Sequence, residues 1–137
     1  MRCMSLSLQK MSVITVFAED LAATKAFYEG VLGLEVLGEE TNEFGPSVVF
    51  KLGSIMINLA HVTAGPDFGA PGAVALRGEG ARVVLPAGVA DVDEACAELA
   101  RLGVPLLDEP RDRPWGIRCA SFVDPAGHIW EIASGIG

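Results

Sequence analysis

VITVFAEDLAATKAFYEGVLG, residues 13–33, is the first of two similar stretches in this chain. It opens with a β-branched apolar run, which is typical of a strand, and Asp20 then stands where a helix N-cap is expected. Apolar residues follow with helical spacing, and Gly33 stands where a helix ends. The stretch therefore predicts a strand followed by a helix.

The second stretch, VVLPAGVADVDEACAELARLG at residues 83–103, repeats this order. Asp91 corresponds to Asp20, and Gly103 corresponds to Gly33, at an offset of about 70 residues. Three short β-type runs separated by Gly or Pro follow each helix: LEVLG, PSVVFKLG and SIMINLAH after the first, and VPLLD, GIRCASFVD and HIWEIAS after the second. Two copies of one β-α-β-β-β module are the simplest interpretation, so the predicted fold class is α+β.

The repeat also sets the expected domain organisation. We expect a flexible N-terminus at residues 1–11, a first module at 12–60, a Gly/Pro-rich linker at 61–80 and a second module at 81–134. A single module would expose one sheet face and its strand edges. The two modules must therefore cover each other or a second subunit, and a homodimer is the natural expectation.

Composition restricts the classes of partner. Ten Lys and Arg residues against eighteen Asp and Glu give a formal net charge of -8, which argues against a nucleic-acid or anionic-membrane partner because both attract cations. No apolar run is long enough to span a membrane. The first eleven residues lack the apolar core and cleavage site of a secretory signal, so we expect a cytoplasmic protein.

Several apolar and sulfur-containing side chains are predicted to be structural. Cys96 falls in a helical pattern and Cys119 in a strand pattern, and three widely spaced cysteines favour reduced thiols over a disulfide framework. Phe27 and Tyr28 should pack one face of the first helix, with the Tyr28 hydroxyl bonded to a backbone partner. Trp130 should lie in the core, on the strand face opposite its neighbour in sequence.

Three segments carry a family resemblance: EDLAATKAFYEGVLGLEVL at 19–37, KLGSIMINL at 51–59 and PWGIRCASFVDPAGHIWEIA at 114–133. Together they resemble the vicinal oxygen chelate superfamily, which includes glyoxalase I, extradiol dioxygenases and bleomycin-resistance proteins, over about residues 12–134. The DPAGHIWEI run is the most specific motif. The resemblance implies paired modules whose mixed sheets curl into half-open barrels, usually in a dimer.

The metal positions of the glyoxalase-like members are poorly filled in this sequence. The resemblance implies one ligand from the first strand and one from the last strand of each module, which carries over to Val13 and Asn58 in the first module and to Val84 and Glu131 in the second. A shift in the fifth strand would bring Arg82 to the position of Val84, but neither valine nor arginine binds a metal. One good ligand is too few, so no metal and no cofactor are expected.

Glu131 is the candidate site residue with the most possible chemical roles. Its neighbours in the strand alternate so that it should point into the concave face of the sheet, opposite to Trp130. It either pairs with Arg118 or Arg82, or acts on a ligand as a contact or a general base whose pKa burial has raised. His128 stands three residues away, so its side chain should point to the other face, and we interpret it as a turn or strand-entry residue. 

Other members of the superfamily, of the bleomycin-resistance type, sequester a drug without a metal. Trp115 in the RPWGIR run offers a flat face for stacking an aromatic or cationic ligand. The sequence thus predicts a metal-free protein that binds a small organic molecule, in the manner of antibiotic sequestration. The first candidates for ligand contacts are Trp115, Arg118 and Glu131, and the second are Asn58 and Arg82. One alternative is a lyase, isomerase or dioxygenase relative that uses Glu131 in an atypical metal site or as an acid–base group, and a second is a small structural or regulatory interaction module.

Overall fold

The structure is a computed structural model that describes residues 6–68, 74–80 and 82–135, apart from the side chains of Asn42 and Asp67. The start of the predicted N-terminal segment, with Cys3, and residues 69–73 and 81 of the predicted linker and second module lie outside the described residues. 

The first module contains the predicted strand, helix and three further strands. They are β1 (Val13–Ala18), α1 (Leu21–Gly30), β2 (Glu35–Asn42), β3 (Gly45–Leu52) and β4 (Ile55–His61). The sheet order is β1-β4-β3-β2, with β1 parallel to β4 and the other pairs antiparallel. A 3-10 helix, η1 (Val62–Phe68), follows β4 in the region predicted as linker.

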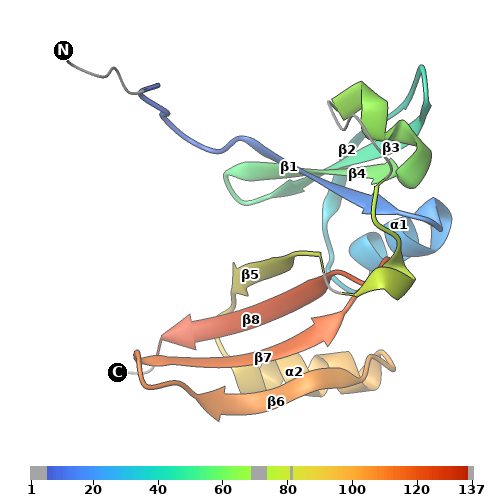
Figure 1. Cartoon of the computed structure of the whole chain (residues 1–137). Coiled ribbons are helices and arrows are strands. Elements are labelled where there is room, and N and C mark those ends of the chain that lie inside the picture. Colours follow the sequence, from blue (N-terminus) through green and yellow to red (C-terminus); the bar gives the residue numbers. More distant parts are fainter. Residues whose placement is uncertain (1–5, 69–73, 81, 136–137) are drawn as a thin grey trace.

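The second module repeats this architecture. A short 3-10 helix, η2 (Arg77–Glu79), precedes it, and its elements are β5 (Val84–Gly88), α2 (Val92–Arg101), β6 (Leu106–Asp112), β7 (Ile117–Val123) and β8 (Ile129–Gly135). The sheet order β5-β8-β7-β6 again contains one parallel pair, β5 with β8. Figure 1 shows the two sheets as separate layers, so the α+β prediction of two repeated modules is confirmed.

Both helices begin where the repeat predicts, and α2 also ends there, whereas α1 ends at Gly30, three residues before Gly33. The Asp20 carboxylate accepts the Ala23 N–H at 3.0 Å, and the Asp91 carboxylate accepts the Glu94 N–H at 3.1 Å. Each aspartate therefore caps its helix by satisfying a backbone donor that has no partner within the helix. Gly103 follows α2 with a φ of 76°, a conformation that other residues adopt at a cost. Among the described residues, no helix is sufficiently long and apolar to traverse a bilayer.

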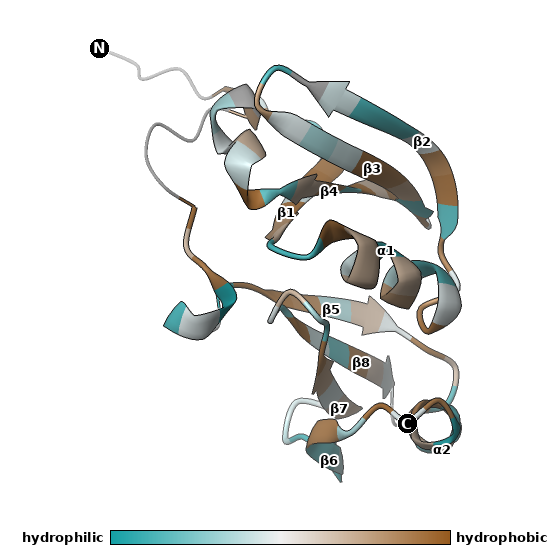
Figure 2. Ribbon diagram, turned by 90° about the vertical axis from the view of Figure 1, so that its right-hand side faces the viewer, coloured by the Kyte–Doolittle hydropathy of each residue, from teal (hydrophilic) through white to brown (hydrophobic). Residues whose placement is uncertain are grey.

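One continuous core joins the modules. Figure 2 shows α1 between the first sheet and the strands β5 and β8. The Tyr28 ring of α1 contacts Phe50 of β3 at a centroid distance of 5.4 Å and Trp130 of β8 at 5.6 Å. The Phe27 ring lies 6.2 Å from Phe122 of β7. The prediction that Trp130 is a core residue is confirmed, because it is 3% exposed.

We call the contact between the two modules the seam. A buried carboxylate lies at this contact and joins residues of both modules. Asp124, in the turn before β8, is 1% exposed and accepts the Tyr28 hydroxyl at 2.6 Å and the Trp130 indole N–H at 3.1 Å. It also accepts the backbone N–H groups of Ala126 and His128, both at 2.9 Å. The prediction of a backbone partner for Tyr28 is therefore wrong, since a side chain far along the sequence supplies the acceptor.

The chain's single tyrosine gives this seam a direct spectroscopic test. Burial, together with the negative charge of Asp124, raises the pKa of Tyr28 far above its ordinary value near 10. We expect the folded protein to show no phenolate absorbance as the pH rises past about 10, and the phenolate to appear only with unfolding.

The same pKa shift sets the sign of the pH dependence. Above about pH 10 the unfolded chain releases the Tyr28 proton while the folded chain retains it, so the free energy of unfolding falls with increasing pH, by up to about 1.4 kcal/mol per pH unit from this group. Tyr28→Phe should remove that component in alkaline urea titrations. A reversible phenolate titration of the folded protein near pH 10 would contradict the buried contact with Asp124.

Candidate functional site

The face of the second sheet opposite α2, which is predicted to be concave, carries polar side chains. Glu131 of β8 lies directly across from Ser121 of β7, and Cys119 lies across from Ala133. Directly opposed residues share a face, and residues two apart along a strand also share it. Cys119, Ser121 and Glu131 therefore lie on one face, and Trp130 points to the other, into the core, as the alternation predicts.

Arg113 lies over this face, in the turn between β6 and β7. Its Nε donates to the Cys119 sulfur at 3.1 Å, and its Nη2 donates to the Asp108 carboxylate at 3.1 Å. The hydrogen bond to Cys119 raises the pKa of Arg113, and the negative charges of Asp108 and Glu131 contribute in the same direction. Glu131 is thus within electrostatic reach of Arg113, although the two make no ion pair within 4.0 Å.

Trp115 completes the arrangement. Its side chain is 69% exposed, and the Arg113 guanidinium carbon lies 5.9 Å from the centroid of the indole ring, in cation–π contact. We call Arg113, Trp115, Cys119 and Glu131 the concave-face cluster. It combines an accessible aromatic surface, a fixed cation and a half-buried carboxylate, which are the groups that bind a flat organic molecule and its polar substituents.

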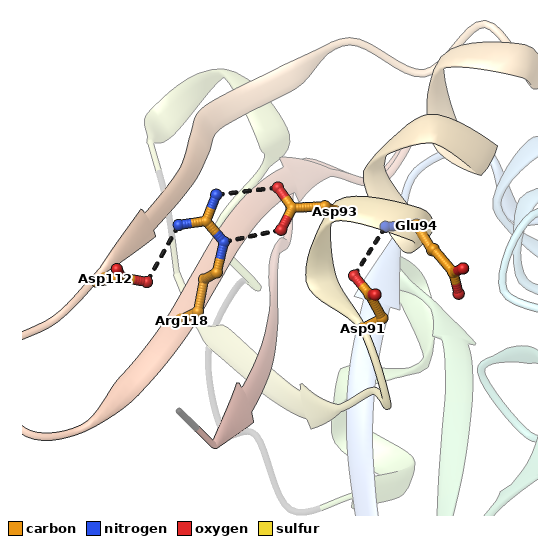
Figure 3. Close-up of polar contacts among 5 residues, drawn as sticks. All are labelled: Asp91, Asp93, Glu94, Asp112 and Arg118. Atoms are coloured by element: carbon orange, nitrogen blue, oxygen red, sulfur yellow. Dashed lines mark hydrogen bonds and ion pairs between the residues drawn. The ribbon is translucent and has the colours of Figure 1, made fainter. Parts of the chain in front are cut away.

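Arg118 does not belong to this cluster. It is adjacent to Cys119 in β7 and so points to the helix side of the sheet, where its guanidinium forms two hydrogen bonds of 2.9 Å with Asp93 of α2 (Figure 3). A third bond, of 3.1 Å, reaches Asp112. The expected pairing of Arg118 with Glu131 is therefore wrong: the two residues lie on opposite faces of one sheet.

The ion pairs of Arg118 shift the pKa values of the residues that form them. The hydrogen bond from Arg118 lowers the pKa of Asp93, and Asp93 and then Asp112 raise the pKa of Arg118. All three side chains are in contact with solvent, so the network is screened and adds little to stability. We interpret Arg118 as a residue that holds α2 against β6 and β7.

The two remaining predicted residues lie elsewhere. Asn58 of β4 is buried in the first sheet, and its side-chain amide donates to the Thr15 hydroxyl at 3.3 Å. Arg82 lies before β5 and donates to the backbone carbonyls of Ala75, at 2.6 Å, and of Ala126. The expected pairing of Arg82 with Glu131 is also wrong. Of the five predicted site residues, only two are related to Arg113: Trp115 through the cation–π contact and Glu131 through its charge.

The sequence interpretation missed Arg113 and assigned Cys119 to the core alone. Cys119 is indeed buried and forms no disulfide, but its sulfur is also the acceptor that positions Arg113. A signal was present: Arg113 stands two residues before Trp115, close enough for stacking across a turn.

A model of the Glyoxalase/Bleomycin resistance protein/Dioxygenase superfamily matches residues 10–132. The chain belongs to this superfamily. The resemblance seen in the DPAGHIWEI run and its companion segments is thereby confirmed.

Solved structures of superfamily members share this fold. A glyoxalase/bleomycin resistance protein/dioxygenase from Nocardioides has a TM-score of 0.80 at 21% identity, and the match covers 96% of this chain and 87% of that chain. TnmS3, an antibiotic binding protein from Streptomyces sp. CB03234, has a TM-score of 0.71 at 25% identity, with 96% and 99% covered. A lactoylglutathione lyase from Agrobacterium tumefaciens has a TM-score of 0.70 at 28% identity, with 93% and 94% covered. Comparison with proteins of curated function finds no significant match.

The metal site of the superfamily's glyoxalase-like members does not fit the residues of this chain. Val13 and Val84 carry no donor atom, and the strand register places Thr15 beside Asn58 and Pro86 beside Glu131. Within the part of the chain that the structure describes, no three His, Cys, Asp or Glu side chains gather into a metal-binding group. A carboxylate and an amide from separate sheets are a poor donor set for a catalytic metal.

Proposed function

We propose that this chain binds a small aromatic or cationic organic molecule at the concave-face cluster, without a metal ion, and that it acts by sequestering that molecule. The observation that carries the proposal is the exposed Trp115 indole, held by Arg113 at the edge of a face that also bears Glu131. A fixed aromatic ring of this kind supplies contact area at low entropic cost.

The charges favour a ligand with cationic character. Glu131 forms no ion pair with any described side chain, so its carboxylate is free to accept a ligand cation. Asp108 is shared by Arg113 and Arg111, so its carboxylate offsets only part of the Arg113 charge. The net charge of -8 adds long-range attraction, which acts mainly on the association rate.

The likeness to TnmS3, described as an antibiotic binding protein, supports sequestration. The likeness to a lactoylglutathione lyase keeps one enzymatic alternative open, in which Glu131 acts as an acid–base group on a bound substrate. The two functions differ in how they depend on Glu131: Glu131→Gln abolishes turnover in an enzyme, whereas binding that rests on stacking survives it.

Intrinsic fluorescence tests the binding site directly, because the only other tryptophan, Trp130, is buried. We expect ethidium, a planar aromatic cation, and bleomycin to be suitable probes, and at least one of them to quench Trp115. Trp115→Ala should weaken that probe's affinity, measured by calorimetry, by about tenfold or more, since loss of a stacked cation contact costs up to about 2 kcal/mol.

Arg118→Ala provides the matched control, because it removes a nearby charge from the opposite face of the same sheet. Its affinity for the probe should equal that of the unaltered protein. Equal affinities for Trp115→Ala and the unaltered protein, or loss of binding in Arg118→Ala alone, would exclude the concave-face cluster as the binding site.

We also propose that the protein is a homodimer. Apolar side chains remain exposed at the starts of two of the edge strands, β1 and β5, with Val13 43% and Val84 48% exposed, and a second copy would cover them. Sedimentation equilibrium should give twice the 14.4 kDa mass of one chain, and Val84→Lys should shift the species toward that single mass. A 14.4 kDa species at all concentrations would contradict the dimer.

We also propose a cytoplasmic location, which agrees with the state of the cysteines. The thiols of Cys96 and Cys119 are both free and buried, as is usual in a reducing compartment.

A further inference from the structure

An apolar groove of about 310 Å³ lies in the seam, at the N-terminal end of β1. Ile14 and Ile57 line it from the first sheet, and Leu85 and Trp130 line it from the second. Every side chain that lines the groove is apolar or aromatic. Such a groove holds water poorly, because an ordered water needs about two to four polar partners. The single chain thus leaves part of the core between its modules open to solvent.

The chain reaches this groove from an exposed segment, residues 6–12, which we call the N-terminal arm. Met11 lines the groove, whereas Leu6 and Leu8 are 86% and 88% exposed. Figure 1 shows the arm leading away from the two sheets beyond the start of β1. Exposed leucines forgo the favourable free energy that burial of their side chains gives. The arm and the groove are therefore two apolar surfaces of the same chain that solvent still reaches.

The sequence of the arm has the pattern of a strand with one apolar side. From Leu6 to Gln9 it alternates Leu, Ser, Leu and Gln, so an extended arm places both leucines on the same side. In the single chain Ser7 instead has a φ of 53°, which is uncommon for a residue other than glycine, and the arm forms no strand. The alternation fits an extended arm bound to an apolar surface, and not the conformation of the free arm.

A second copy of the chain brings an arm and a groove together. We propose that the N-terminal arm of each copy lies extended in the groove of the other, with Leu6 and Leu8 against its apolar walls. Two-fold symmetry makes this exchange reciprocal, so one arrangement covers both arms and both grooves. The inference rests on the homodimer proposed above, and it names the segment that holds the two copies together.

Two further observations favour a second copy as the occupant of the groove. Val84, which is assigned above to the dimer interface, also lines the groove. The strands β1 and β5, which border the groove, are both edge strands of their sheets. An edge strand offers unpaired backbone groups to an added strand, so an extended arm finds hydrogen-bond partners there as well as apolar contacts.

Paired substitutions in the arm test the exchange. Leu6→Asp with Leu8→Asp places charge on its apolar side, and Ser7→Asp with Gln9→Asp, the matched control, adds the same charge to its polar side. All four side chains are exposed in the single chain, so both variants should fold, as circular dichroism and urea unfolding establish. By sedimentation equilibrium, we expect the leucine variant to raise the dimer dissociation constant at least about tenfold, and the control to stay within about twofold.

Photocrosslinking locates the arm. Protein with p-benzoylphenylalanine in place of Leu8 is mixed with nitrogen-15-labelled unaltered protein, left to exchange subunits and irradiated. Any cross-link to a labelled peptide then joins two copies. We expect the unlabelled arm to be joined to labelled peptides that contain residues 52–57 or 83–86, which line the groove.

The outcomes distinguish this inference from the homodimer itself. An unchanged dissociation constant in the leucine variant, or an equal rise in both variants, would overturn the arm exchange and leave the dimer standing. Cross-links confined to unlabelled peptides would also overturn it, because each arm would then lie in its own groove. A 14.4 kDa species for the unaltered protein at all concentrations would refute the homodimer, and the arm exchange with it.

Discussion

Asp124→Ala should lower the free energy of unfolding by about 4 kcal/mol or more, the largest loss expected from any single substitution considered for this protein. Asp124 is almost completely buried and accepts four hydrogen bonds, from Tyr28, Ala126, His128 and Trp130. Alanine leaves all four donors buried without an acceptor, at about 1–3 kcal/mol each before relaxation. Because domains of this size are stable by about 5–15 kcal/mol, the variant is expected at the margin of folding.

Graded substitutions keep this prediction testable if Asp124→Ala does not fold. Asp124→Asn retains the shape and one acceptor oxygen, and should cost about 2 kcal/mol. Tyr28→Phe removes one donor instead of the acceptor and should cost less than Asp124→Asn, since no buried polar atom loses its only partner. Asp112→Ala, at an exposed aspartate, is the matched control and should change the urea midpoint little. Similar midpoints for Asp124→Ala and Asp112→Ala would contradict the buried role of Asp124.

Phe122→Ala should cost about 3–5 kcal/mol, the second largest effect, because it deletes a large side chain from a packed interior. Phe122 is 1% exposed on β7, and its ring packs against Phe27 of α1. The substitution thus opens a cavity at the point where a helix of the first module meets the sheet of the second. Leu107→Ala, at a residue of β6 that is 58% exposed, should cost less than about 0.5 kcal/mol.

Phe122→Ala also tests whether the modules unfold together. Tyr28 reports on the first module and Trp130 on the second, and both contact the same core. If that core is shared, the urea midpoints of unfolding followed by the ultraviolet signals of the two residues should fall by the same amount. A shift of the Trp130 signal with an unchanged Tyr28 signal would show two independent cores and contradict the seam.

The repeat explains why the fold was predictable from sequence. Asp20 and Asp91 act locally, each capping the helix that it precedes, and β-branched runs between glycines mark strands without reference to the rest of the chain. Strand alternation likewise separated Trp130 from Glu131 correctly, because that pattern depends only on neighbouring residues.

The composition of the site was less predictable because it depends on partners distant in sequence. Arg118 is predicted as a partner of Glu131, but the pairing register of β7 with β8 places it on the opposite face, toward Asp93 of α2. Arg113 was overlooked because its orientation is set by the Cys119 sulfur and by Asp108 across the β6–β7 turn. The contacts of Arg113 with Cys119 and Asp108 have no signature in the sequence, although its spacing from Trp115 does.

Metal content and ligand affinity, measured on the same samples, test metal-free binding at the concave-face cluster most directly. Untagged protein would be purified from medium replete in Ni, Zn, Fe, Mn and Co, divided, and one half stripped with a chelator before both halves are titrated with ethidium. We predict well under one metal ion per chain in the unstripped half, and the same ethidium affinity in both. About one divalent metal ion per chain, together with ethidium binding that is lost on stripping and restored on reloading, would contradict metal-free binding.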